Sequence, residues 1–312
     1  MVQLHETYLI MESKELKEFK KNVGQSNHYL ITLLIGLDAV KNGYKKPDYL
    51  DSKWDPENLD NSVNRTKIYS FRAAMAWLGD NVDTYFSSIT SLLRKLNPSS
   101  DLLLEIDFSN VHSVHKVFTH FKDKSSDKIG VEYWAYVDML IQWRNNLTHK
   151  NASNSLIPEA STYFNSNKSG IIKSYKGKEI DIHLDTKKLL NDFKDNETIT
   201  LKDIATLISK TIQYITKLDN LIMEQINPFD YYDYIIYKIE KKAEKDKVKK
   251  TDLQKVFENI KGKETKTDKM RRYMRCLGFP REKYNNIDDY IKDVSPLTYN
   301  DFKSRINNKF SS

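Results

Sequence analysis

The sequence predicts an all-α protein, and three of its properties lead to that prediction. Its 312 residues include only 9 glycines and 7 prolines, the residues that most often end helices and form turns. Large apolar side chains recur at spacings of three and four through several long segments, which is the period of an amphipathic helix. Hydrophobic residues make up 39% and charged residues 30%, as in a globular protein with an ionic surface. We therefore expect an antiparallel helical bundle followed by a second helical domain.

Two amphipathic helices are expected first, over residues 26–42 and 64–95. Ser26 or Asn27 is a suitable N-cap for the first of them, and Gly43 directly after it is a suitable stop. The second helix should end before Pro98, because the residue that precedes a proline is disfavoured in the helical region.

Three further helices and a small hairpin complete the first domain, which we place at residues 1–226. The helices are expected over 110–122, 130–150 and 200–226. Between the last two, residues 151–199 differ in composition and are interpreted as an insertion. Residues 171–184 within it carry β-branched side chains on both sides of a Lys-Gly pair, which predicts a β-hairpin.

Residues 227–312 are expected to form a second, basic helical domain. From 238 to 281 there are 16 Lys and Arg against 7 Asp and Glu, while the whole chain has a formal charge of +7. The basic character therefore belongs to this segment. Thr251, Thr267 and Ser295, each followed by Asp or Pro, are expected to begin three short helices.

The candidate nucleic-acid contacts in the basic segment are Arg271, Arg272, Tyr273 and Arg275. Guanidinium groups bind phosphate, and an aromatic ring can stack on a base. A lysine-rich helix also keeps a surface soluble, and the same surface could bind a protein partner. The mixture of Arg and Tyr favours nucleic acid.

The strongest chemical signal is the end of the helix expected over 130–150, with the sequence Arg-Asn-Asn-Leu-Thr-His. Arg144 falls on or beside the apolar stripe, and a half-buried guanidinium costs free energy unless an anion or an acceptor meets it. His149 follows near the carbonyl end of the helix, where an imidazolium is favoured. A phosphate-binding fork close to a proton-transfer group suits phosphodiester chemistry.

The pattern Arg144-Asn145-x3-His149 resembles the HEPN superfamily (higher eukaryotes and prokaryotes nucleotide-binding), whose ribonucleases carry R-x4-6-H, often with Asn, Asp or His after the Arg. The helical organisation over 26–226 is similar as well. By residue identity the resemblance rests on three positions. It implies a HEPN-like antiparallel four-helix bundle, here with the hairpin insertion and the basic C-terminal domain.

The resemblance further implies a metal-independent endoribonuclease in which the RNA 2′-hydroxyl attacks the neighbouring phosphorus and leaves a 2′,3′-cyclic phosphate. His149 would be the general base or acid, Arg144 would neutralise the phosphate oxygens, and Asn145 would orient the imidazole or the phosphate. No cofactor or metal is expected. A toxin or anti-phage defence effector is implied, with an antitoxin or other defence protein as partner. In the resembled family, toxins controlled by a nucleotidyltransferase usually carry the modified Tyr two residues after the His. Here that position is Asn151, which argues against control by that modification.

On an ideal helix, Arg144 and His149 are about 140° apart. Either the last turn unwinds, or two chains combine their motifs in a homodimer with a shared cleft, as is common in the resembled family. Asp80 and Asp83, beside Gly79 in the long helix, are carboxylates that could reach the motif; otherwise they belong to a solvated face.

Two alternatives to a ribonuclease site remain open. Arg144 could extend its guanidinium to the surface while His149 only caps a helix end. In the other alternative, the chain has the family fold without the activity and is a non-catalytic RNA-binding or protein-interaction module on the same bundle.

Three histidines, His112, His115 and His120, lie near Asp107 and Asp123. They could bind a metal, one could line an RNA cleft, or they could belong to a packed helix, which the apolar residues around them favour. The sequence contains no Gly-rich phosphate loop, no G-x-S-x-G and no H-E-x-x-H.

A cytoplasmic location without membrane contact is the expectation. Cys276 is the single cysteine, so no intramolecular disulfide can form, as is usual in a reducing compartment. Residues 1–18 have no apolar core of a signal peptide, and the longest apolar run, 29–37, is too short to cross a bilayer.

Overall fold

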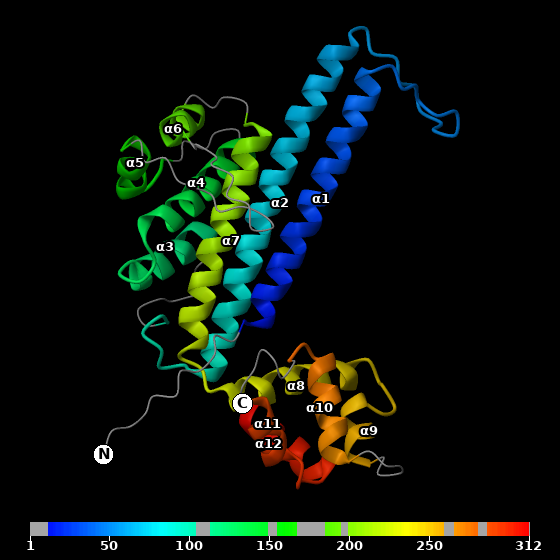
Figure 1. Cartoon of the computed structure of the whole chain (residues 1–312), viewed down its shortest axis with the longest axis vertical. Helices are drawn as coiled ribbons and strands as arrows, with labels where there is room; N and C mark the ends of the chain where they lie inside the picture. Colours follow the sequence, from blue (N-terminus) through cyan, green and yellow to red (C-terminus); the bar gives the residue numbers. More distant parts are fainter. Residues whose placement is uncertain are drawn as a thin grey trace. The chain divides into compact units, whose positions relative to one another are not determined.

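The structure, a computed structural model, describes residues 12–103, 113–148, 155–166, 185–194, 199–258, 265–279 and 286–311 (Figure 1). Over these residues all regular secondary structure is helical, in twelve helices without a strand. The all-α prediction is therefore confirmed for this part of the chain. The hairpin expected over 171–184 lies outside the described residues.

The contacts of the chain separate it into two compact units. The motif unit consists of residues 15–89 and 105–218, and the C-terminal unit of residues 1–14, 90–104 and 219–312. The boundary expected after 226 thus falls inside the C-terminal unit.

Polar contacts join the three segments of the C-terminal unit. The backbone and side chain of Ser13 both donate to the buried carboxylate of Asp219, and the Asn97 side chain donates to the carbonyl of Gln225. These partners are far apart in sequence, so no boundary drawn along the chain could anticipate them.

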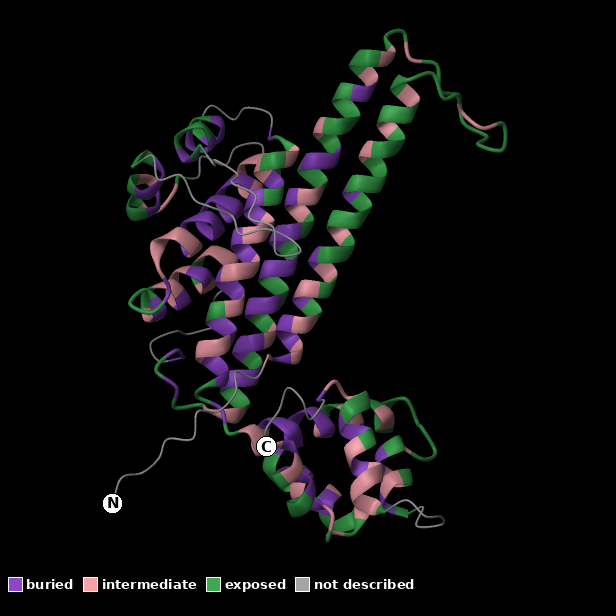
Figure 2. Ribbon diagram, viewed as in Figure 1, coloured by how far each residue is buried: buried purple, intermediate pink, exposed green. Residues whose placement is uncertain are grey.

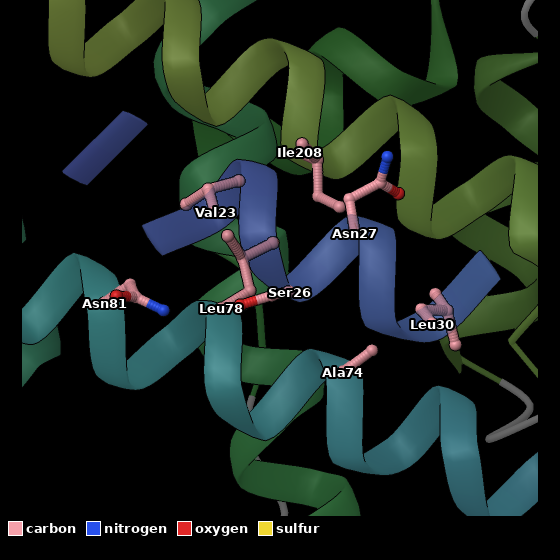
Figure 3. Close-up of a pocket in the computed structure, with 8 residues that line it drawn as sticks. All are labelled: Val23, Ser26, Asn27, Leu30, Ala74, Leu78, Asn81 and Ile208. Carbon is pink, nitrogen blue, oxygen red and sulfur yellow. The ribbon is translucent and has the colours of Figure 1, made fainter. Parts of the chain in front are cut away.

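Three long helices lie side by side in the motif unit: α1 (Lys14–Lys41), α2 (Leu59–Leu96) and α7 (Leu201–Met223) (Figure 1). Side chains of all three line one small cavity, among them Val23, Leu78 and Ile208 (Figure 3). The cavity measures about 10 Å³, which is room for one water molecule and not for a nucleotide.

The first helix begins twelve residues before the expected start at 26. The stripe continues backwards through Leu16, Phe19 and Val23, which are all buried. Ser26 lies inside this helix and is therefore not its N-cap. Its hydroxyl donates to the carbonyl of Asn22 one turn earlier. The expected stop is confirmed, since Gly43 follows the last turn with a φ of +96°.

Aromatic rings hold the shorter helices of the motif unit to the long ones. In α3 (Val114–Ser125), Phe118 and Phe121 pack against Phe86 of α2, and Phe118 also meets Tyr214 of α7. The helix α4 (Val131–Thr148) contributes Val137, Leu140 and Ile141, which are fully or almost fully buried.

The insertion contains two helices that were not predicted from the sequence, α5 (Pro158–Asn165) and α6 (Thr186–Lys194). Phe164 of α5 packs on Tyr136, and Phe193 of α6 packs on Trp143. Both partners belong to α4. Each new helix is only two turns long, so its apolar period is too short to recognise.

In the described residues beyond 227, the C-terminal unit has five helices. They are α8 (Pro228–Lys245), α9 (Asp252–Glu258), α10 (Lys266–Cys276), α11 (Ile287–Val294) and α12 (Tyr299–Phe310). Thr251 precedes α9 as expected and accepts a hydrogen bond from the backbone of Gln254. The other two expected starts are wrong. Thr265 rather than Thr267 caps α10, and Thr298 rather than Ser295 caps α12.

The capping box explains both corrections. Thr265 has Asp268 three residues later, and Thr298 has Asp301, so side chain and backbone hydrogen-bond reciprocally. Thr267 stands directly before Asp268 and cannot form this pair.

Exposed residues predominate in the C-terminal half of α1, in the N-terminal half of α2 and in the loop that connects them (Figure 2). Large apolar side chains are exposed there, including Tyr29, Ile35, Tyr69 and Trp77. Within the described part of the chain, none of the helices has the length and apolarity that a membrane span requires.

Candidate functional site

Arg144 emerges from the buried stripe of α4, as its spacing predicts. The residues one turn before it are fully buried, whereas 26% of the Arg144 side chain is exposed. Its aliphatic stem crosses α2 at Gly79, where an added Cβ would lie 3.1 Å from Cγ and 3.3 Å from Nε. The missing side chain at Gly79 therefore lets the arginine lie against the backbone of α2.

Two oxygen acceptors hold the guanidinium group. One terminal nitrogen donates to the carboxylate of Asp80 at 2.7 Å, and the other donates to the side-chain oxygen of Asn145 at 3.2 Å. The expectation that a carboxylate of the long helix reaches the motif is thus confirmed for Asp80. Asn145 accepts a hydrogen bond from Arg144, so Asn145 orients the guanidinium group.

A second carboxylate adds negative charge beside Arg144. Partial desolvation raises the pKa of Asp83, the positive charge of Arg144 lowers it, and repulsion from Asp80 raises it. Arg144 is therefore flanked by two acidic groups that an incoming phosphate would meet.

Because Asp80 and phosphate would bind the same guanidinium, we expect Asp80→Asn to increase the affinity for RNA. Removing one charge at about 4 Å in water is worth about 1 kcal/mol, or roughly a fivefold change. Fluorescence anisotropy with a non-cleavable 2′-O-methyl oligonucleotide measures it. Asp127→Asn is the control, since it removes the same charge from the turn before α4, at the opposite end of that helix from Arg144. An equal gain in both variants would contradict competition at Arg144.

The contact at Gly79 leads to a separate prediction. We expect Gly79→Ala to weaken RNA binding, because the new methyl group displaces the arginine stem. Thermal stability should not fall in parallel, since alanine is favoured over glycine inside a helix by about 0.5–1 kcal/mol. The matched control is Gly36→Ala in α1, where an added Cβ meets no atom within 4 Å. Equal RNA affinity in the two variants would show that the contact has no role.

His149 lies outside the described residues, so the relative placement of the two motif residues is not part of the structure. The far end of the connection from α4 to α5 is, however, described. The backbone N–H of Ile157 donates to the fully buried carboxylate of Asp138, six residues before Arg144. This bond ties the start of α5, at Ile157, to α4.

Asp138 also accounts for one of the three candidate histidines. Its other oxygen lies 3.2 Å from His115 Nε2 and 3.4 Å from the side-chain nitrogen of Gln142. His115 is thus tied to α4, and the ring of His120 packs edge-on against Phe121. His112 is outside the described residues. Among the described residues, no group of three potential metal ligands comes together.

Asp138 was not among the residues predicted from the sequence. The available signal was an aspartate inside a long apolar run with Gln142 one turn later on the same face. A carboxylate at such a position must find hydrogen-bond donors, and here it finds three.

The four candidate nucleic-acid contacts of α10 are divided between surface and core. Arg271 is held between the carboxylates of Asp268 and Asp288, and burial raises the pKa of the Tyr273 hydroxyl well above its ordinary value. Tyr273 is only 8% exposed, which leaves no ring face for a base. Arg272 and Arg275 are exposed. The structure thus does not assemble the four side chains into one stacking surface.

Comparison with known proteins gives no match, either to a family model, to a curated protein or to a solved structure.

Proposed function

We propose that the chain is a metal-independent endoribonuclease of the HEPN type. The observation that carries the proposal is the half-buried Arg144, fixed by two acceptors and still partly exposed, at the end of the helix that leads to His149. A preorganised guanidinium can take up negative charge at the moment it develops on a phosphate. In this proposal α1, α2, α4 and α7 are the four helices of the HEPN bundle.

In the proposed reaction, the RNA 2′-oxygen attacks the adjacent phosphorus while a base removes its proton. The bond from phosphorus to the 5′-oxygen breaks, and that oxygen takes up a proton. The products are a 2′,3′-cyclic phosphate and a free 5′-hydroxyl. His149 acts as the base or the acid, and Arg144 binds the non-bridging oxygens. Asn145 holds Arg144 in place.

The biological setting that we propose follows from the sequence resemblance. The chain would act as a toxin or anti-phage defence effector in the cytoplasm, with an antitoxin or defence protein as partner. A homodimer with a composite cleft would bring together Arg144 and His149.

A second candidate function is a non-catalytic RNA-binding or protein-interaction module. The observation that favours it is the ion pair between Arg144 and Asp80, which ties α4 to α2 and gives the arginine a structural role. Such a module would retain RNA in a salt-dependent way and create no new ends.

Cleavage of a labelled RNA by the wild type and by His149→Ala decides between the two functions. The proposal requires cleavage by the wild type and its loss in the variant, with RNA retained by both proteins. RNA retention without cleavage by the wild type would support the binding module and overturn the ribonuclease.

A further inference from the structure

Two exposed aromatic side chains lie on α2, the helix that Arg144 contacts at Gly79 and Asp80. Tyr69 is 73% exposed and Trp77 is 56% exposed, although burying such rings is normally favourable. Trp77 lies one turn before Asp80, the carboxylate that binds the Arg144 guanidinium. The aromatic rings therefore belong to the helix that supplies the carboxylate partner of Arg144.

The charges around these rings are of one sign. Residues 61–79 of α2 include Arg65, Lys67 and Arg72 and no Asp or Glu. Residues 22–37 of α1, which runs beside α2 (Figure 1), also contain no Asp or Glu. Along α2, a polyanion would meet Arg65, Lys67 and Arg72 before the carboxylate of Asp80.

Helical geometry aligns Tyr69 and Arg72 with Asp80, and it places Trp77 beside their stripe, about 60° around the axis from Asp80. Tyr69, Arg72, Ala76 and Asp80 follow one another at spacings of three and four, so they form one stripe along the helix. From Tyr69 to Asp80 the helix rises by about 16 Å, at about 1.5 Å per residue. The small Ala76 leaves the stripe open between Arg72 and the guanidinium. The distance suits a short piece of an extended strand.

We propose that Tyr69, Arg72 and Trp77, here called the α2 track, bind single-stranded RNA and deliver it to Arg144. Bases stack on the two aromatic rings, and Arg72, which lies between Tyr69 and Trp77 along the helix, binds a phosphate. Only unpaired bases expose both faces for such stacking, so the substrate is an unpaired region of RNA. This inference rests on the proposed function and names its substrate class.

Exposed aromatic rings also occur on surfaces that bind proteins. The flanking cations of α2, and the position of the rings on the helix that contacts Arg144, favour RNA over a protein partner. A role in self-association is therefore an outcome that the test must distinguish.

The test is a titration of the full chain with a 2′-O-methyl single-stranded oligonucleotide, which binds but cannot undergo 2′-oxygen attack. We expect quenching of tryptophan fluorescence, and a roughly tenfold loss of affinity in both Tyr69→Ala and Trp77→Ala, the range typical of lost base stacking. Trp54→Ala is the matched control, because Trp54 is 44% exposed in the loop between α1 and α2 and outside the track. The duplex of the same sequence should bind more weakly.

Two results would overturn the track. One is an affinity in Trp77→Ala equal to that in Trp54→Ala. The other is a change of oligomeric state in Trp77→Ala, seen by sedimentation, with unchanged RNA affinity, which would assign the rings to a protein interface. Because the oligonucleotide cannot be cleaved, a wild type that binds it through Trp77 but cleaves no RNA would support the track and refute only the proposed function.

Discussion

Arg144→Ala should lower kcat for RNA cleavage by about 10²–10³-fold, the usual effect of removing one group that stabilises developing negative charge. Thermal stability should change little, because the partner Asp80 is 62% exposed and an ion pair of this kind contributes at most about 1 kcal/mol. Single-turnover cleavage assays and thermal denaturation measure the two quantities. The prediction is thus a large kinetic loss in a protein that remains folded.

Arg144→Lys sharpens this prediction. Lysine keeps the charge but loses the planar fork that contacts Asp80 and Asn145 together, so we expect only partial recovery of cleavage. Arg94→Ala, in the last turn of α2, is the control for removing an arginine elsewhere. Cleavage by Arg144→Ala at the wild-type rate would show that the guanidinium takes no part in the reaction.

The second large effect is expected in the C-terminal unit, at Asp233. This fully buried carboxylate accepts from Tyr290 at 2.8 Å and binds Arg305 at 3.1 Å and Lys309 at 3.4 Å. Asp233→Ala would leave these donors without their buried partner. Removal of one member of a buried ion pair typically costs about 3–5 kcal/mol. Urea unfolding followed by far-UV circular dichroism measures the loss.

A neighbouring carboxylate provides the control for Asp233. Asp293 also binds Arg305, at 2.6 Å, but 46% of its side chain is exposed. We expect Asp293→Ala to change the free energy of unfolding by less than about 1 kcal/mol. Similar losses in the two variants would show that the burial of Asp233 does not set the size of the effect.

The long helices could be predicted because each repeats its apolar period over many turns. The position of Arg144 on the buried stripe followed from the same periodicity, whereas the sequence left open whether Asp80 reaches the motif or belongs to a solvated face. The start of α1 was wrong because a serine was treated as a cap, whereas Leu16 and Phe19 continue the stripe. In this helix, the continued burial of apolar side chains overrides the preference of one residue for a cap.

Contacts between distant segments account for what could not be predicted. The helices of the insertion are stabilised by Tyr136 and Trp143 of α4, and no local pattern announces such a partner. The burial of Tyr273 likewise depends on tertiary packing, whereas its sequence context of arginines suggested a surface. Of the candidate site, spacing could predict that Arg144 lies on the apolar stripe of its own helix, but not that it crosses α2 at Gly79.

The most direct measurement is the chemistry of the RNA ends produced by the purified protein in excess EDTA. A ribonuclease built on Arg144 and His149 should cleave under these conditions and leave a 2′,3′-cyclic phosphate and a 5′-hydroxyl. Arg144→Ala and His149→Ala should leave the RNA intact. Cleavage that persists in both variants, or that requires a metal and leaves 5′-phosphate ends, would contradict the proposed function.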